Sequence, residues 1–262
     1  MTGDSNVRME DLERRLRDGD AEALAEVFSR ERDRLWQIIH FRLAEPLRGR
    51  LGADDVLQEA YMAASQRLKH YASSPATSPF IWLRMIVNQT LIDLHRQHLG
   101  AQKRDAAREV AIDGLPYGQA TSASVAIQLI GQFTSPSRAA ARADMLGLVQ
   151  AAIGQMDPID REVLALRHFE NLTNSEVAEA LGIEQGAASI RYIRALRRLN
   201  PELPVIAISG VPTQRVELEA NFGPHIRFLP KPFLVEKALS LARELLDDLA
   251  PPTGAADRPA RK

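Results

Sequence analysis

The chain of 262 residues has no cysteine, which excludes disulfide bonds, thiolate metal sites and cysteine nucleophiles. Aromatic side chains make up only 5% of the residues, so the core must be built mostly from Leu, Ile, Val and Ala, a composition that favours helices. With 45% hydrophobic and 26% charged residues, the composition is that of a soluble globular protein. The length leaves room for two or three small domains.

Long hydrophobic runs are also missing. No stretch approaches the roughly 20 apolar residues of a membrane-spanning helix, and the polar start, MTGDSNVRMEDLERRLRDGD, lacks the apolar centre of a secretion signal. The sequence therefore predicts a cytoplasmic protein without membrane contact. The six histidines show no metal-ligand spacing, and no Gly-rich phosphate loop or paired nucleophile and base occurs. We therefore expect no metal, no cofactor and no enzymatic activity.

Helical patterns fill residues 7–99, which we predict to form one domain of a mainly α-helical protein. The stretch DAEALAEVFSRERDRLWQIIHFRL has apolar residues at helical spacing, with Asp20 as its N-cap. After a short break at Glu45-Pro46, GADDVLQEAYMAASQRL forms a second amphipathic helix that carries Asp54 and Asp55 in its first turn. The loop YASSPATSP leads to a third, strongly apolar helix, FIWLRMIVNQTLIDLHRQHL.

Residues 100–143 lose this periodicity and are interpreted as a linker that can hold short helical pieces, and the helical pattern returns over 144–199. Asp157-Pro158 ends one helix and starts the next. Thr173 and Glu176 fit a capping box at the start of a short helix that Gly182 ends. A last helix runs from about Gln185 to residue 199, so this domain has the pattern of a helix-turn-helix.

The last helix is rich in arginine and has no acidic residue between Ser189 and Leu199. The second helix of a helix-turn-helix lies in the major groove of DNA, with its N-terminal residues on base edges. We therefore predict that bases are read by Gln185, Ser189, Arg191 and Tyr192, and that phosphates are contacted by Arg194, Arg197 and Arg198. The alternative is a solvated basic face on a structural helix.

Polar and basic groups also lie on, or just after, the third helix of the first domain. Together with Trp82, these groups suit single-stranded DNA, whose bases stack and whose phosphates are gripped by basic side chains. The residues concerned are Trp82, Asn88, Arg96, Lys103 and Arg104. For Trp82 the alternative is an ordinary position in the core.

Four segments carry a resemblance to a known family: DDVLQEAYMAASQRL, SPFIWLRMIVNQTLIDLHRQHLGAQKRD, MDPIDREVLALRHFENLTNSEVAEALGI and AASIRYIRALRRL. Together they resemble an extracytoplasmic-function sigma factor of the sigma-70 family, of the planctomycete type, over about residues 7–199. The resemblance implies that core RNA polymerase and promoter DNA are the partners, with an anti-sigma factor as a further one. Region 2 would then melt the −10 element, and region 4 would read the −35 element.

By position, the resemblance assigns the single-strand residues above to the −10 element and the arginine-rich helix to the −35 element. It also implies a contact with the polymerase clamp through Asp54, Asp55, Gln58 and Glu59. For Asp54 and Asp55 the alternative role is helix capping, and both roles can hold together.

Residues 200–249 have a different sequence pattern and resemble the second half of a response-regulator receiver domain. PVIAISG has the pattern of a strand buried on both faces of a parallel sheet, and IRFLPKPF is a second strand candidate. The resemblance points to Ser209 and Lys231 as remnants of a phosphoryl site and implies a cis bond between Lys231 and Pro232. The acidic pair and the phosphoaccepting Asp of a receiver are absent, so we predict no phosphotransfer. Residues 250–262 are expected to be a disordered tail.

Two functions therefore compete. The first is a sigma factor with an inert appendage. The second is a sigma mimic that sequesters an anti-sigma factor, because certain stress regulators join a sigma-like domain to a receiver in this order. Such regulators need a receiver that can be phosphorylated and need no arginine-rich recognition helix, so the sequence favours the sigma factor.

Overall fold

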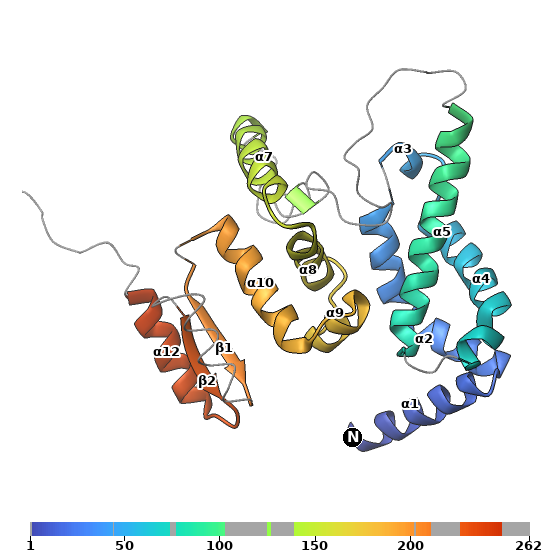
Figure 1. Ribbon diagram of the computed structural model, residues 1–262, viewed down its shortest axis with the longest axis horizontal. Helices are drawn as coiled ribbons and strands as arrows, with labels where there is room; N and C mark the ends of the chain where they lie inside the picture. Colours follow the sequence, from blue (N-terminus) through green and yellow to red (C-terminus); the bar gives the residue numbers. More distant parts are fainter. Residues whose placement is uncertain are drawn as a thin grey trace, which may run out of the picture. The chain divides into compact units, whose positions relative to one another are not determined.

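The computed structural model describes residues 2–43, 45–73, 77–102, 125–126, 139–201, 203–210 and 226–247. The described part of the protein is mainly helical, as predicted, and it contains one small sheet near the C-terminus (Figure 1). The chain divides into two compact units, Met1–Ala195 and Leu196–Lys262. Most of the predicted linker and all of the predicted disordered tail lie outside the described residues. Among the described helices, none has the length and apolar character needed to cross a membrane.

Four helices pack on one another in the first unit and form what we call the N-terminal bundle: α1 (Thr2–Arg17), α2 (Ala21–Arg42), α4 (Ala53–Ser73) and α5 (Pro79–Gln102). As predicted, Asp20 caps α2, and its carboxylate accepts hydrogen bonds from the backbone N–H groups of Glu22 and Ala23. The break expected at Glu45-Pro46 contains a one-turn helix, α3 (Glu45–Arg48), which sequence reasoning did not predict.

The helix-turn-helix module follows, and all of it except the last turn of α10 lies in the same unit: α7 (Ala139–Gly154), α8 (Pro158–His168), α9 (Asn174–Leu181) and α10 (Gln185–Leu199). Its start is earlier than predicted, because α7 begins inside the residues interpreted as linker. The capping box of Thr173 and Glu176 is present, and Gly182 ends α9 in the left-handed conformation with φ 63°. These local signals fix the turn between α9 and α10.

The second unit holds two parallel strands, β1 (Val205–Ser209) and β2 (Ile226–Pro230), and the helix α12 (Val235–Asp247). Both strands were expected, and the Lys231-Pro232 bond is cis. The prediction that β1 is buried on both faces was wrong: Val205 is only half-buried and Ile208 is 46% exposed. With a single partner strand among the described residues, β1 lies at an edge rather than inside a wide sheet.

Candidate nucleic-acid interface

The start of α10 is tied to α9 by side-chain hydrogen bonds. The Asn174 amide Nδ2 donates to the Gln185 carbonyl oxygen at 2.9 Å and to Ser189 Oγ at 2.8 Å. Gln185 Nε2 donates to Ser175 Oγ at 3.1 Å, while the side chain remains exposed. The helix therefore presents the exposed Gln185 in a fixed frame, whereas Ser189 is half-buried against α9.

The middle of α10 is braced against the first turn of α8. Arg191 Nη1 donates to Asp160 Oδ1 at 2.7 Å, and Arg194 Nη1 lies 3.6 Å from Asp160 Oδ2. The Asp160 side chain is only 5% exposed, whereas Arg194 is 53% exposed. Arg191 is thus directed towards a buried carboxylate on its own module, and Arg194 keeps more than half of its surface for another contact.

Tyr192, predicted to read bases, packs towards the end of α8 instead. Its hydroxyl lies 3.0 Å from His168 Nε2, and the Arg167 guanidinium sits 5.3 Å from the centre of its ring. The ring is half-buried, and burial raises the pKa of Tyr192. Its position is that of a packing residue, because the apolar stripe of α10 includes the ring.

The two arginines at the end of α10 differ in their contacts. Arg197 Nη2 donates to the carbonyl oxygen of Pro201 at 3.0 Å, just beyond the helix end, whereas Arg198 is exposed. Arg198 and Arg194 are therefore the most accessible of the arginines predicted for phosphates.

Trp82 lies in the core of the N-terminal bundle, which agrees with the alternative considered for it. Its ring is 8% exposed and stacks on Tyr71, with the ring centres 4.3 Å apart. The Tyr71 hydroxyl donates to the carbonyl oxygen of Thr77 at 2.9 Å, and burial raises its pKa to about 12. Trp82 is therefore placed to support the loop before α5 rather than to offer an exposed ring for stacking.

The other residues predicted for single-stranded DNA are differently placed. Asn88 is half-buried, and its Oδ1 is a buried acceptor that finds no hydrogen-bond donor among the described residues. Such an acceptor is costly unless a donor reaches it. Arg96 is exposed near the end of α5, and Lys103 and Arg104 lie outside the described residues.

The residues predicted for the polymerase clamp are all exposed on the first two turns of α4: Asp54, Asp55, Gln58 and Glu59. Asp55 Oδ2 accepts a hydrogen bond from the Gly52 N–H at 3.0 Å, and Asp54 Oδ1 accepts one from Arg32 Nη2 at 2.5 Å. The capping role of Asp55 is therefore present, and it leaves the carboxylate on the surface.

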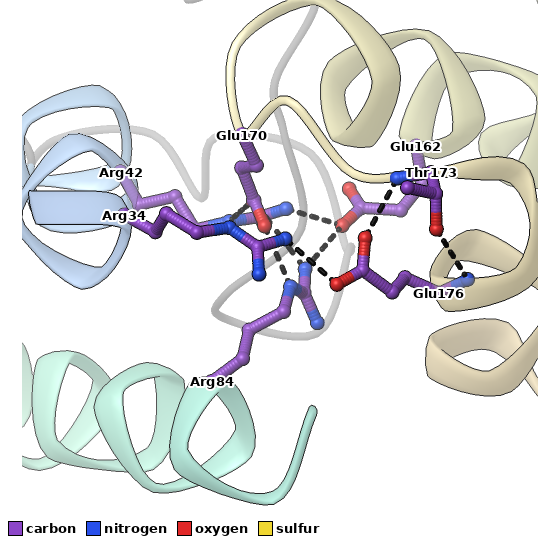
Figure 2. Close-up of polar contacts among 7 residues, drawn as sticks. All are labelled: Arg34, Arg42, Arg84, Glu162, Glu170, Thr173 and Glu176. Carbon is purple, nitrogen blue, oxygen red and sulfur yellow. Dashed lines mark hydrogen bonds and ion pairs between the residues drawn. The ribbon is translucent and has the colours of Figure 1, made fainter. Parts of the chain in front are cut away.

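Sequence reasoning missed a buried ion network that joins the N-terminal bundle to the helix-turn-helix module. Figure 2 shows Arg42 of α2 and Arg84 of α5 facing Glu162 of α8 and Glu170 of the following loop. Arg42 pairs with both carboxylates, and Arg84 Nε donates to Glu170 Oε2 at 2.6 Å. All four side chains are at most 7% exposed.

The two arginines of this network keep the Glu170 carboxylate ionised despite its burial. Burial alone would raise the pKa of Glu170, but Arg42 and Arg84 outweigh it, so the pKa lies below its usual range. One signal in the sequence pointed here: Arg84 interrupts the apolar run FIWLRMIV, where an arginine needs a buried partner. The partner could not be predicted from the sequence, because Glu170 lies 86 residues from Arg84 along the chain.

Further contacts flank the ion network. Arg34 Nη2 donates to Glu176 Oε1 at 2.7 Å, so the capping-box glutamate of α9 also binds the bundle (Figure 2). The guanidinium of Arg34 lies 3.5 Å from the centre of the Phe80 ring. Phe41 and Phe169 stack across the same seam with their ring centres 4.7 Å apart. The seam is therefore both ionic and apolar.

Comparison with known proteins covers both parts of this unit. Residues 27–99 match the family described as Sigma-70 region 2, and residues 152–200 match Sigma-70, region 4. The ECF RNA polymerase sigma factor SigD of Mycobacterium tuberculosis is 30% identical over 186 residues, which cover 71% of this chain and 79% of SigD. The ECF RNA polymerase sigma factor SigW of Bacillus subtilis is 24% identical over 191 residues, covering 72% of this chain and 94% of SigW.

A likeness is also found to a solved structure described as CnrH in complex with the cytosolic domain of CnrY, at 22% identity and a TM-score of 0.40. It covers 72% of this chain and 93% of that one.

The two family matches and the relatives SigD and SigW define the class: the protein is a sigma-70 type regulator of transcription initiation, and this class is not enzymatic. More narrowly, the chain belongs to the extracytoplasmic-function sigma factors. The region 2 match ends at residue 99 and the region 4 match at residue 200, so neither extends into the strands.

Proposed function

We propose that this chain binds core RNA polymerase and directs it to promoters by reading a −10 and a −35 element. The observation that carries the proposal is the recognition helix α10. It follows a capped helix and a glycine turn, contains no acidic residue, and presents Arg194 and Arg198 to solvent. Exposed arginines on the second helix of a helix-turn-helix are the groups that grip DNA phosphates.

Within the −35 element, we assign different tasks along α10. The exposed Gln185 at the first turn is the best-placed reader of a base edge, because side chains at this end enter the major groove. Arg194 and Arg198 contact phosphates. Three further residues of α10 are also assigned to DNA: Arg191, Tyr192 and Arg197. Each already has a hydrogen-bond partner within the protein, so each must exchange that partner to contact DNA.

At the −10 element, Asn88 is the favoured contact. Its buried Oδ1 acceptor would be satisfied by an N–H donor on the Watson–Crick edge of a flipped base, an edge that is freed only when the duplex opens. Arg96, further along α5, would hold the backbone of the melted strand. Trp82 contributes by supporting the loop that precedes α5.

The polymerase contact is assigned to the exposed acidic start of α4. Asp54, Asp55 and Glu59 bring three carboxylates to one end of the helix, beside the exposed amide of Gln58. A surface of this sign suits a basic partner. We also propose an anti-sigma factor as a partner, and a cytoplasmic location, because the polymerase works there.

The C-terminal unit is proposed to descend from a receiver domain. Its two strands are parallel, and the register pairs Ser209 with Pro230, so the remnant positions Ser209 and Lys231 come to the same sheet edge. The order of a sigma-like part followed by a receiver-like part also favours a second candidate, a mimic that binds an anti-sigma factor. A planctomycete origin of the sigma part likewise stays a proposal.

The test is promoter selection by the reconstituted enzyme. Core RNA polymerase with the full chain is expected to enrich DNA with two common elements from a random pool, whereas core polymerase alone enriches none. Arg194→Ala and Arg198→Ala should weaken binding to the selected DNA and reduce its salt dependence by about one charge each. Lys237→Ala, which removes an exposed charge from α12, is the matched control.

A chain that binds core polymerase but enriches no sequence would contradict promoter reading. Tight binding to an anti-sigma factor together with no binding to core polymerase would favour the mimic.

A further inference from the structure

The helix α12 carries two apolar stripes, and only one of them is turned towards its own unit. Ala238, Leu241 and Leu245 recur at helical spacing, with Leu245 only 5% exposed and the other two half-buried. Val235 and Leu239 lie one turn apart on a neighbouring face of the helix, and they are 67% and 52% exposed. Large apolar side chains that stay in water side by side mark an interaction surface.

The exposed stripe has the spacing of a seam between two helices. Val235, Leu239 and the half-buried Ala242 follow one another at intervals of four and three residues, which is the spacing of the a and d positions of a coiled coil. Leu234, which is 74% exposed, extends the apolar surface at the start of the helix. The surface therefore fits another helix with the same apolar spacing.

Two exposed charges of opposite sign flank this stripe on one side. Glu236 follows Val235 and Arg243 follows Ala242, so the two charges lie seven residues, or about two turns, apart on the same side of the seam. Neither side chain makes a hydrogen bond or an ion pair with another described residue. Both charges are therefore free to meet a partner helix.

This order of charges is complementary to itself when the helix is reversed. In an antiparallel pair, the flanking position near the start of one helix meets the flanking position near the end of the other. Glu236 of each copy then faces Arg243 of the second copy, twice by symmetry. In a parallel pair the same charges would face the other flank of the stripe, which holds Ala238 and Leu245 and is turned towards its own unit.

We propose that α12 is a self-association surface and pairs antiparallel with α12 of a second copy of this chain. The pairing sets Leu239 of one copy against the small Ala242 of the other, so that a large side chain packs on a small one. Because the surface carries one acid and one base, it matches its own reversed copy better than a partner of one charge sign. The contact is short, so we expect a weak dimer with a dissociation constant on the order of 10 μM.

Sedimentation equilibrium of the full chain tests the dimer without polymerase or DNA, so the result does not depend on the proposed function. Between about 1 and 100 μM, the average mass should rise from that of one chain towards that of two. The mass of one chain throughout this range would overturn the proposal, as would assembly beyond two chains.

An apolar-to-charged substitution tests whether the stripe is the contact. Leu239→Asp should weaken self-association by about a hundredfold, because both copies lose a buried leucine. Leu148→Asp on α7, at a position that is 74% exposed, is the matched control and should leave the dimer unchanged. Because Leu239 is exposed, its replacement leaves the core intact. A dimer that persists in the Leu239→Asp chain would overturn the proposal.

Charge reversal tests the antiparallel orientation. Glu236→Arg makes both flanking positions basic and Arg243→Glu makes both acidic, so each variant alone should self-associate about tenfold more weakly. An equal mixture of the two variants restores opposite charges at both contacts and should associate as the unaltered chain does.

The control reversals lie on the helix side away from the seam, at the exposed positions Lys237→Glu and Glu244→Arg. These variants should associate as the unaltered chain does, alone or mixed. Self-association of the Glu236→Arg and Arg243→Glu chains at full strength, or no recovery on mixing them, would overturn the antiparallel pairing.

Discussion

At the scale of single residues, Asp160 restricts the arginines of α10 that can contact DNA. Its buried carboxylate holds Arg191 at 2.7 Å and lies 3.6 Å from Arg194. The Arg191 guanidinium, bonded to Asp160, is less free to reach a phosphate, whereas Arg194 keeps more than half of its side chain exposed. Asp160 therefore limits the charge that α10 offers to DNA and fixes the direction of Arg191.

Asp160→Asn should accordingly strengthen binding to random DNA and steepen its salt dependence by about one charge, because Arg191 becomes available to phosphates. The ratio of promoter to random affinity should fall. Binding measured over a series of salt concentrations checks this, with the exposed Asp33→Asn as control. An unchanged salt dependence would mean that Arg191 stays committed to its own module.

Local features such as helix caps were also the part of the structure that the sequence predicted best. The caps at Asp20 and Thr173 and the glycine turn at residue 182 were predicted because their signals lie within a few residues of one another. The partners of Arg84 and Tyr192 were not predictable in the same way, since they depend on how distant helices pack. Tyr192 was predicted to read bases, and helical spacing alone cannot tell a packing tyrosine from a reading one.

At the scale of elements, the turn between α9 and α10 depends on Gly182. Its φ of 63° is a conformation that L side chains rarely adopt, although open space surrounds the position. Gly147, in the middle of α7, is also surrounded by open space but has an ordinary helical backbone.

The same substitution should therefore have opposite effects at the two glycines. Gly182→Ala should lower the free energy of unfolding by about 1 kcal/mol, whereas Gly147→Ala should raise it by about 0.5–1 kcal/mol. Urea denaturation followed by circular dichroism measures both changes. Equal effects at the two positions would mean that the left-handed turn is not required for folding.

The docking of α9 on the bundle should depend on acid pH. The pKa values of Glu170 and Glu176 are lowered despite burial, by Arg42 and Arg84 for Glu170 and by the Thr173 N–H and Arg34 for Glu176. Their stabilising contribution is thus complete above the usual carboxyl pKa of 4.5 and is lost as the pH falls through the lower folded values.

We therefore expect the free energy of unfolding, measured by urea denaturation, to stay constant from about pH 7 to pH 5 and to fall below about pH 4. A chain carrying Glu170→Gln and Glu176→Gln should show a smaller acid response, because two of the titrating groups are gone. An identical acid response in that variant would assign the effect to other carboxyl groups.

At the scale of the whole molecule, the two units raise the question of what the C-terminal part contributes. The helix α10 ends at Leu199, and both family matches end by residue 200. The fold class and the order of the domains were predictable from the helical periodicity and from the change to apolar, strand-like runs after residue 200. The exposure of Ile208 was not, because the sequence pattern does not reveal how many strands lie beside β1.

A chain ending at Leu199 should initiate transcription from the same start sites as the full chain and in similar yield, because the proposed DNA and polymerase contacts all precede that residue. Primer extension on the products compares the two. Higher yield from the shortened chain would show instead that the C-terminal unit inhibits initiation.

The most direct test of the whole account is run-off transcription on a promoter selected by core RNA polymerase carrying the full chain. The account predicts a transcript from one defined start site when the chain is present, none with core polymerase alone, and a loss of that transcript with Arg194→Ala and Arg198→Ala combined. Binding of the chain to core polymerase without any promoter-specific transcript would contradict it.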